Sequence, residues 1–364
     1  MHPFQDSLQV WFSRKLPEHA FNQCWEIPFV LSSDIGLVRK ENQDRVAALH
    51  TGKKSVNPLF AIAVVDGMGG MRDGGVCASL ALSGFFYALI QYRSLEIKDR
   101  INAAIKLANK QVFDIYNGSG GATLTAVLFD SQGNRLFVHV GDTRIYTFSS
   151  NAQVQRHTTD DSLAEAVGGS GRELLQFVGM GESMQPKIAE LTDAGEFCAI
   201  TTDGIHGIEE KTLNKLFVNS SDIKQIAERL CNVSKWCGGH DNATSAILNL
   251  KNIAESLSHY EVNGIRIWDA QGDLTTLWLK EGDVGINFLQ GQNVNNSVDK
   301  DEGILSSKQV SEKLTNQQKK INKDRASKKR TVNKKKADSQ PEKIQLDIEI
   351  GKSGEKGEFD VDTE

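Results

Sequence analysis

The chain has 364 residues, with 42 Lys and Arg against 47 Asp and Glu and a formal net charge of −5 at pH 7. This length can bury one large core, with or without attached segments, and the near balance of charge indicates no polyanionic partner for the chain as a whole. The five cysteines are dispersed, odd in number and without Cys-x-x-Cys spacing, which argues against a disulfide framework or a structural zinc site and fits a reducing cytoplasm.

Residues 1–28 are expected to form an N-terminal extension that packs on the main domain, because their aromatic side chains show no clear period. The chain does not open with a basic segment followed by an apolar core. Its longest apolar stretches, residues 59–65 and 78–90, are too short to span a bilayer. We therefore expect a soluble, cytoplasmic protein without a membrane partner.

The main domain is predicted for residues 29–250. It begins with a short strand, which leads into a polar loop that carries Arg39, Asn42 and Asp44. The odd spacing of Arg39 and Asp44 places them on opposite faces of an extended segment, whereas a turn at Asn42 would bring both into one pocket. A solvated charged loop is the alternative interpretation.

An apolar run at 60–65, rich in Ile and Val, is followed by Asp66, Gly67, Met68 and two further glycines. The run is too short for a buried helix, so it predicts a buried strand that delivers a carboxylate to a loop. Glycine has no side chain, and the backbone behind Asp66 can therefore turn a carbonyl towards an ion or a phosphate. Considered alone, an ordinary strand-end turn explains this stretch equally well.

The rest of the domain alternates between helical and strand patterns. Apolar residues at helical spacing predict helices over 76–92, 99–116 and 222–236. Short apolar runs between turn residues predict strands, antiparallel where hairpins join them, over 121–129, 135–140, 144–148, 196–202 and 243–249. The polar segment 149–195, with helical patches at 162–167 and 173–177, is predicted to be a surface insertion.

The composition changes beyond residue 250. Residues 251–290 are expected to contain an appended β-hairpin around a turn at 270–273, and its attachment to the main sheet is left open. Residues 291–364 are predicted to be a disordered charged tail, with 12 Lys or Arg against 2 acids over 308–336 and 9 acids against 3 lysines over 337–364. A solvated tail is expected, and binding of nucleic acid through 308–336 is the alternative.

Three strand ends carry acidic residues into polar turns, at Asp66, Asp203 and Asp241, and Asp44 and Asp142 stand beside similar turns. If these strands are neighbours, four or five carboxylates gather in a small volume, where their repulsion requires cations. Oxygen ligands suit hard ions such as Mg²⁺ or Mn²⁺. Two such ions could activate a water and screen a phosphate that an arginine binds through two hydrogen bonds.

These motifs, in their order along residues 29–250, resemble the signature series of the bacterial metal-dependent serine/threonine protein phosphatases, the PPM or type-2C family. The resemblance rests on Gly36 to Asp44, Val65 to Gly70, Gly121 to Thr123, Val140 to Arg144, Thr202 to Gly204 and Asp241 to Thr244. It implies an α+β fold, a four-layer α-β-β-α sandwich of two antiparallel sheets flanked by helices, in which segment 149–195 is the flap beside the site.

The resemblance also implies two Mn²⁺ or Mg²⁺ ions and roles for individual residues. Asp66 would bridge the ions, the Gly67 carbonyl would bind one of them, and Asp203 and Asp241 would hold the other. Arg39 would bind the phosphate and Asp44 would support the site; Arg39, Asp44 and Asp66 are thus the expected catalytic residues.

Several positions depart from the family pattern. Gln43 replaces a common Glu, Met68 replaces the histidine that animal members offer as a general acid, and Gly207 replaces an acidic residue. Protonation of the leaving group therefore falls to water, and a third ion is not expected. His206 and His240 are more often supporting or surface residues than direct participants beside an acidic site.

The predicted function is hydrolysis of phosphoserine and phosphothreonine in proteins by a metal-activated water. Phosphoproteins are the expected substrates, and a cognate Ser/Thr kinase is the expected counterpart. The alternative, motivated by Gln43, Gly207 and Ala122, is a non-catalytic regulatory module of the same fold that binds phosphoproteins.

Overall fold

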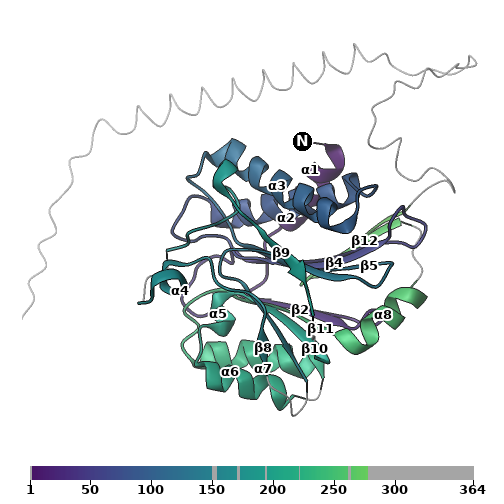
Figure 1. The fold of residues 1–364 in the computed structure, drawn as a ribbon. Coiled ribbons are helices and arrows are strands. Elements are labelled where there is room, and N and C mark those ends of the chain that lie inside the picture. The colour runs from purple at the N-terminus through teal and green to yellow at the C-terminus, as the bar shows by residue number, and fades with distance from the viewer. Residues whose placement is uncertain are drawn as a thin grey trace, which may run out of the picture. The chain divides into compact units, whose positions relative to one another are not determined.

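The computed structural model describes residues 2–149, 154–169, 173–192, 195–220, 222–260 and 264–277, which form two antiparallel β-sheets covered by helices (Figure 1). The first sheet has the order β1-β2-β11-β10-β7-β8. Its strands are β1 His19–Cys24, β2 Phe29–Asp34, β7 Arg144–Phe148, β8 Gln155–Arg156, β10 Phe197–Thr201 and β11 Ala243–Asn249.

The second sheet has the order β13-β12-β3-β4-β5-β6-β9. Its strands are β3 Arg45–Thr51, β4 Leu59–Val65, β5 Leu124–Asp130, β6 Arg135–Val140, β9 Lys187–Glu190, β12 Gly264–Asp269 and β13 Gly272–Leu277. All seven residues of β4 are buried. A strand that is covered on both faces needs a continuous apolar run, which is the pattern that identified β4 in the sequence.

Three apolar layers hold the sheets and helices together. Between the sheets, the Phe29 ring packs against Phe60 and Trp268, with ring centroids 5.7 and 5.4 Å apart. Outside the second sheet lie α1 Pro3–Phe12, α2 Gly74–Gln91 and α3 Ile97–Tyr116 (Figure 1). Outside the first sheet lie α5 Asp203–His206, α6 Glu210–Val218 and α7 Ile223–Trp236. The predicted four-layer α-β-β-α sandwich is confirmed.

The two long helices over the second sheet, α2 and α3, differ in hydrophobic pattern because they are buried differently. Helix α2 is apolar all round, since it lies between the sheet and the helices α1 and α3. It is the one helix among the described residues that is long and apolar enough to cross a membrane, but 83% of that window is buried within the fold, as in a core helix. Helix α3 buries one stripe, which includes Ile101, Ile105 and Val112.

Both ends of the described chain join the sheets. Strand β1 pairs with β2 along its whole length, and β12 pairs with β3, so the hairpin β12–β13 extends the second sheet. The Asn22 side chain donates to the carbonyls of Asp269 and Gly272, and this contact ties the two ends together. The compact unit therefore extends beyond both ends of the predicted domain 29–250 and includes α8 Leu250–His259, which contributes Leu250 and Ile253 to the core. The predicted tail 291–364 lies outside the described residues.

The flap differs from its prediction in two places. Residues 173–177 are not helical; Leu174 instead forms an isolated β-bridge with Ser162. Strand β9 pairs with β6 and belongs to the second sheet. Its two end residues are exposed and its two middle residues are half-buried, and this pattern without alternation is too weak to identify an edge strand in the sequence. The first predicted helical patch is α4 Leu163–Val167, which Ser162 caps, and a short 3-10 helix, η1 Gly181–Ser183, lies further along the segment.

Candidate metal centre

The strand registers bring the predicted aspartates to one end of the sandwich. In the first sheet, Thr201 at the end of β10 pairs with Ser245 of β11. Asp203, which follows β10, and Asp241, which precedes β11, therefore lie at the same end of the sheet. In the second sheet, Arg45 pairs with Val65, and the loops just outside this pair carry Asp44 and Asp66. The turn after β6 adds Asp142 to the group.

Mutual repulsion and burial dominate the electrostatics of this end. Burial, together with the negative charges of Asp44, Asp203, Asp142 and Asp241, raises the pKa of Asp66 well above its usual value. Burial and the charge of Asp203 raise the pKa of Asp44 and that of Asp142 to about 7. The structure therefore brings these side chains together closely enough for each to oppose ionisation of the next.

Threonine hydroxyls hold the backbone of Asp66 in place. The Asp66 amide donates to Thr123 Oγ1 at 2.9 Å, and the Thr123 amide donates to the Asp66 carbonyl at 2.8 Å. Thr123 Oγ1 in turn lies 2.7 Å from Thr143 Oγ1. The Thr202 hydroxyl donates to Asp44 Oδ2 at 3.0 Å. These threonines fix the Asp66 backbone and the Asp44 carboxylate through supporting contacts that local sequence pattern does not reveal.

Asn242 connects the Asp241 turn to the Arg39 loop. Its Oδ1 accepts a hydrogen bond from the Gln43 amide at 2.8 Å, and its Nδ2 donates to the carbonyls of Ile35 and Glu41 at 2.9 and 3.1 Å. The side chain is only 4% exposed. Its Oδ1 and both Nδ2 hydrogens are therefore used in holding two loops from different parts of the chain against each other.

The glycines allow the loops to approach closely. A Cβ atom at Gly67 would lie 2.4 Å from the Gly74 carbonyl oxygen, and one at Gly204 would lie 2.0 Å from the Asn242 carbonyl oxygen. Neither position can hold a side chain without moving the backbone that presents Asp66 or Asp203. The Asp-Gly pairs of the sequence thus mark positions where two loops touch.

Arg39 lies beside Asp241, with Nη2 to Oδ2 at 2.6 Å. This contact, with the charges of Asp203 and Asp66, raises the pKa of the Arg39 guanidinium further. A cationic group already faces Asp241, and the remaining donors are oxygen atoms that repel one another. The set of ligand atoms therefore fits hard divalent cations. Asp66, the Gly67 carbonyl, Asp203 and Asp241 would bind them, and the carboxylates would then stay ionised without taking up protons.

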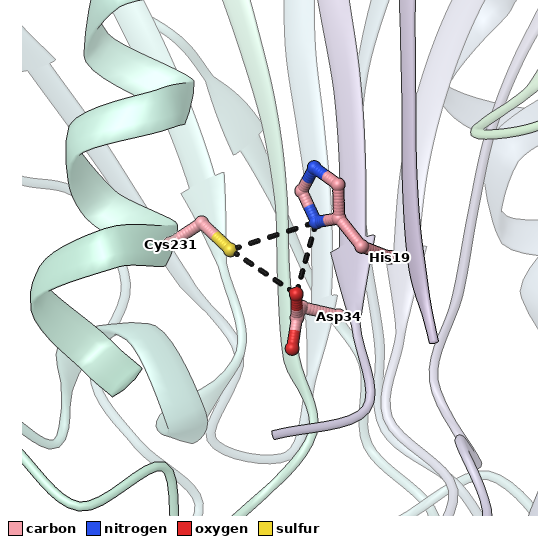
Figure 2. A group of neighbouring side chains, drawn as sticks. All are labelled: His19, Asp34 and Cys231. Atoms are coloured by element: carbon pink, nitrogen blue, oxygen red, sulfur yellow. Dashed lines mark hydrogen bonds and ion pairs between the residues drawn. The ribbon is translucent and has the colours of Figure 1, made fainter. Parts of the chain in front are cut away.

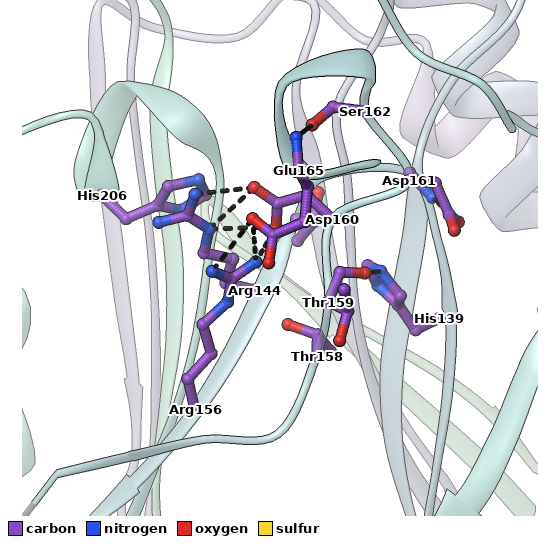
Figure 3. Close-up of polar contacts among 12 residues, drawn as sticks. His139, Arg144, Arg156, Thr158, Thr159, Asp160, Asp161, Ser162, Glu165 and His206 are labelled. Atoms are coloured by element: carbon purple, nitrogen blue, oxygen red, sulfur yellow. Dashed lines mark hydrogen bonds and ion pairs between the residues drawn. The ribbon is translucent and has the colours of Figure 1, made fainter. Parts of the chain in front are cut away.

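A cleft of about 320 Å³ extends from the aspartates to the flap and is lined by Asp142, Arg144, Asp160, His206 and others. Figure 3 shows Arg144 and Arg156 converging on Asp160. Arg144 Nη2 lies 2.6 Å from Asp160 Oδ2, and Arg156 Nη2 lies 2.6 Å from Oδ1. The sequence interpretation missed this cluster; the adjacent acids Asp160 and Asp161 were its only local signal.

The two histidines near the site have different surroundings. His206 is buried and its Nδ1 lies 3.0 Å from Thr201 Oγ1. Burial, together with the positive charges of Arg144 and Arg156, holds the pKa of His206 well below its usual value, so the imidazole is neutral at pH 7. His240 is exposed. Met68, in the loop after Asp66, is half-buried and offers no acidic proton.

Comparisons with known proteins agree with this fold. Serine/threonine protein phosphatase PstP of Mycobacterium tuberculosis is 25% identical over 242 residues, which cover 61% of this chain and 45% of PstP, so the chain spans about half the length of that relative. Protein phosphatase PhpP of Streptococcus pneumoniae is 21% identical over 243 residues, which cover 60% of this chain and 96% of PhpP.

The structure of the serine/threonine phosphatase Stp1 from Staphylococcus aureus aligns with a TM-score of 0.53 at 16% identity, over 65% of this chain and 96% of that chain, which supports a shared fold. The family model described as protein phosphatase 2C matches residues 39–248. This match covers more than half of the sequence and includes every aspartate of the candidate centre. The chain belongs to the protein phosphatase 2C family.

Proposed function

We propose that the protein hydrolyses phosphoserine and phosphothreonine residues of phosphoproteins. The observation that carries this proposal is the gathering of Asp44, Asp66, Asp142, Asp203 and Asp241 at one end of the sandwich, where burial and the neighbouring negative charges raise the pKa of Asp44, Asp66 and Asp142. The same end holds a permanently charged guanidinium, Arg39, which is 42% exposed and can reach a substrate.

The residues of the site have separate roles in holding the ions and in binding the phosphate. Asp66, the Gly67 carbonyl, Asp203 and Asp241 would hold two Mn²⁺ or Mg²⁺ ions, and Asp44, fixed by Thr202, would support them. When bound, these ions would supply an activated water and neutralise charge on the phosphate oxygens. Arg39, whose Nη2 lies 2.6 Å from Asp241 Oδ2, would offer the N–H donors of its guanidinium to the phosphate. Because Met68 has no proton to give, the leaving group takes its proton from water.

The proposal extends to the cellular setting. A Ser/Thr kinase that phosphorylates the same proteins is the counterpart that such an activity requires. The five cysteines are all free thiols, which supports a reducing compartment such as the cytoplasm.

A phosphopeptide assay on the full chain tests the activity. We expect release of phosphate that requires Mn²⁺ or Mg²⁺ and stops with EDTA. Asp66→Asn is expected to lower kcat/KM by more than about 100-fold, since even residues that only support a metal ligand contribute about 10- to 100-fold. Asp114→Asn, which removes an exposed carboxylate of α3, is the matched control. Binding of phosphopeptide without turnover at saturating Mn²⁺ would instead indicate a non-catalytic module.

A further inference from the structure

Three side chains with metal-binding atoms meet on the outer side of the first sheet, near the Arg39 loop but outside the aspartate cluster. His19 comes from β1, Asp34 from the end of β2 and Cys231 from helix α7 (Figure 2). His19 Nδ1 lies 2.9 Å from Asp34 Oδ2, Cys231 Sγ lies 3.5 Å from the same oxygen, and Sγ lies 3.8 Å from Nδ1.

These separations match the spacing of ligands around one small ion. Two ligand atoms that lie about 2.0 to 2.3 Å from a tetrahedral zinc ion are about 3.3 to 3.6 Å apart. Of the three observed distances, 3.5 Å lies within this range, 2.9 Å lies below it and 3.8 Å lies above it. Small side-chain rotations would therefore bring the nitrogen, the oxygen and the sulfur to one ion without moving the elements that carry them.

The carboxylate of the cluster already has one cationic partner, which an incoming ion would have to displace. Asp34 is fully buried, and its Oδ2 lies 2.6 Å from the ammonium of Lys235. Oδ1 accepts a hydrogen bond from the Gly36 amide at 2.9 Å, which fixes the orientation of the carboxylate. The Lys235 side chain is 34% exposed and that of His19 is 49% exposed. Lys235 can therefore turn into solvent, and an ion can enter past His19.

A nucleophilic cysteine is the other chemistry that Cys, His and Asp can perform together. Burial and the charge of Asp34 raise the pKa of the Cys231 thiol to about 12, and its side chain is 3% exposed, so it is neither a thiolate nor accessible to a substrate. One sulfur, one nitrogen and one oxygen donor suit a borderline-soft ion far better than Mg²⁺ or Mn²⁺.

We propose that His19, Asp34 and Cys231 form a zinc-type site, in which a thiophilic divalent cation replaces the Lys235 ammonium on Asp34. On binding, Cys231 releases its thiol proton to solvent, and His19 coordinates through Nδ1 with its proton on Nε2. Lys235 keeps its charge, and a water completes the tetrahedron. Cysteine spacing cannot reveal this site, because Asp34 is 15 residues from His19 and 197 from Cys231 along the chain.

Cobalt spectroscopy tests the site independently of catalysis. The full chain, stripped of metal and kept reduced without thiols, is titrated with Co²⁺. We expect a near-ultraviolet thiolate-to-cobalt charge-transfer band, which the oxygen-only aspartate centre cannot produce. The band should persist in Asp66→Asn and disappear in Cys231→Ser. Cys237→Ser removes the exposed cysteine six positions further on and should leave the band unchanged.

Lys235→Met tests the site through a change that should strengthen Co²⁺ binding instead of abolishing it. Because Lys235 competes with the ion for Asp34, its removal should tighten Co²⁺ binding by about fivefold, the factor that corresponds to a partly exposed ion pair. The proposal is overturned if wild type shows no charge-transfer band at excess Co²⁺, if the band survives in Cys231→Ser, or if Lys235→Met weakens binding. Circular dichroism of each variant establishes that the loss of a band is not a loss of fold.

Discussion

Asn242 holds the Arg39 loop, and its removal is predicted to be costly for both stability and substrate binding. Asn242→Ala removes three hydrogen bonds, to the Gln43 amide and to the carbonyls of Ile35 and Glu41, from a side chain that is 4% exposed. At about 1 kcal/mol of net stabilisation for each bond, the free energy of unfolding should fall by about 3 kcal/mol.

The same change should affect catalysis in a specific way. Arg39 lies between Ile35 and Glu41, two of the three backbone anchors that Asn242 holds. When both anchors are lost, the guanidinium is no longer kept at the site, so KM for a phosphopeptide should rise more than kcat falls.

Urea denaturation of the variant, with phosphopeptide kinetics on the same preparation, measures both effects. The denaturation midpoint should fall while the slope with denaturant stays constant. Asn219→Ala is the matched control, because this exposed side chain makes one hydrogen bond, to the Lys215 carbonyl. A loss below about 1 kcal/mol for Asn242→Ala, the value of a single hydrogen bond, would refute the role assigned to its three contacts.

Two further predictions concern stability. Burial lowers the pKa of His50 to about 4. In the unfolded chain this histidine has a pKa of about 6.5, so between the two pKa values it binds more protons unfolded than folded. The stability present at pH 7 therefore falls by about 2 kcal/mol at pH 5. His50→Leu should remove this share of the pH dependence in urea titrations, and an unchanged pH dependence would contradict it. Gly204→Ala places a Cβ atom 2.0 Å from the Asn242 carbonyl oxygen and should destabilise the fold by about 1 to 3 kcal/mol, whereas Gly70→Ala, with nothing within 4 Å, should not. Equal melting temperatures for the two glycine variants would refute the steric argument.

The centre of the sandwich was predictable because its strands and helices carry local patterns. Strand β4 is a continuous apolar run that ends directly before Asp66, and β10 repeats the pattern before Asp203. Helix α7 shows a 3.6-residue apolar stripe behind the N-cap Asp222. Such patterns arise from contacts between each element and the core, so they are present in the sequence of the element itself.

The edges were not predictable in this way. Strands β1 and β9 have mixed exposure, and a strand that covers only part of one face has little need of alternation. Their places follow from backbone pairing with β2 and β6, to which side-chain pattern contributes little.

From the sequence by itself, apolar runs and Asp-Gly turns predicted the buried strands and the candidate carboxylates, because burial and tight turns impose constraints on neighbouring residues. The four-layer architecture and the roles of the ligands were implied by the resemblance of these motifs to the type-2C family. Only the tertiary structure decided which distant groups share a site: Asn242 with the Arg39 loop, Arg144 with Asp160, and His19 with Asp34 and Cys231. These contacts join residues far apart in the chain, and their geometry is set by the packing of two sheets and the helices over them. No local period records that packing.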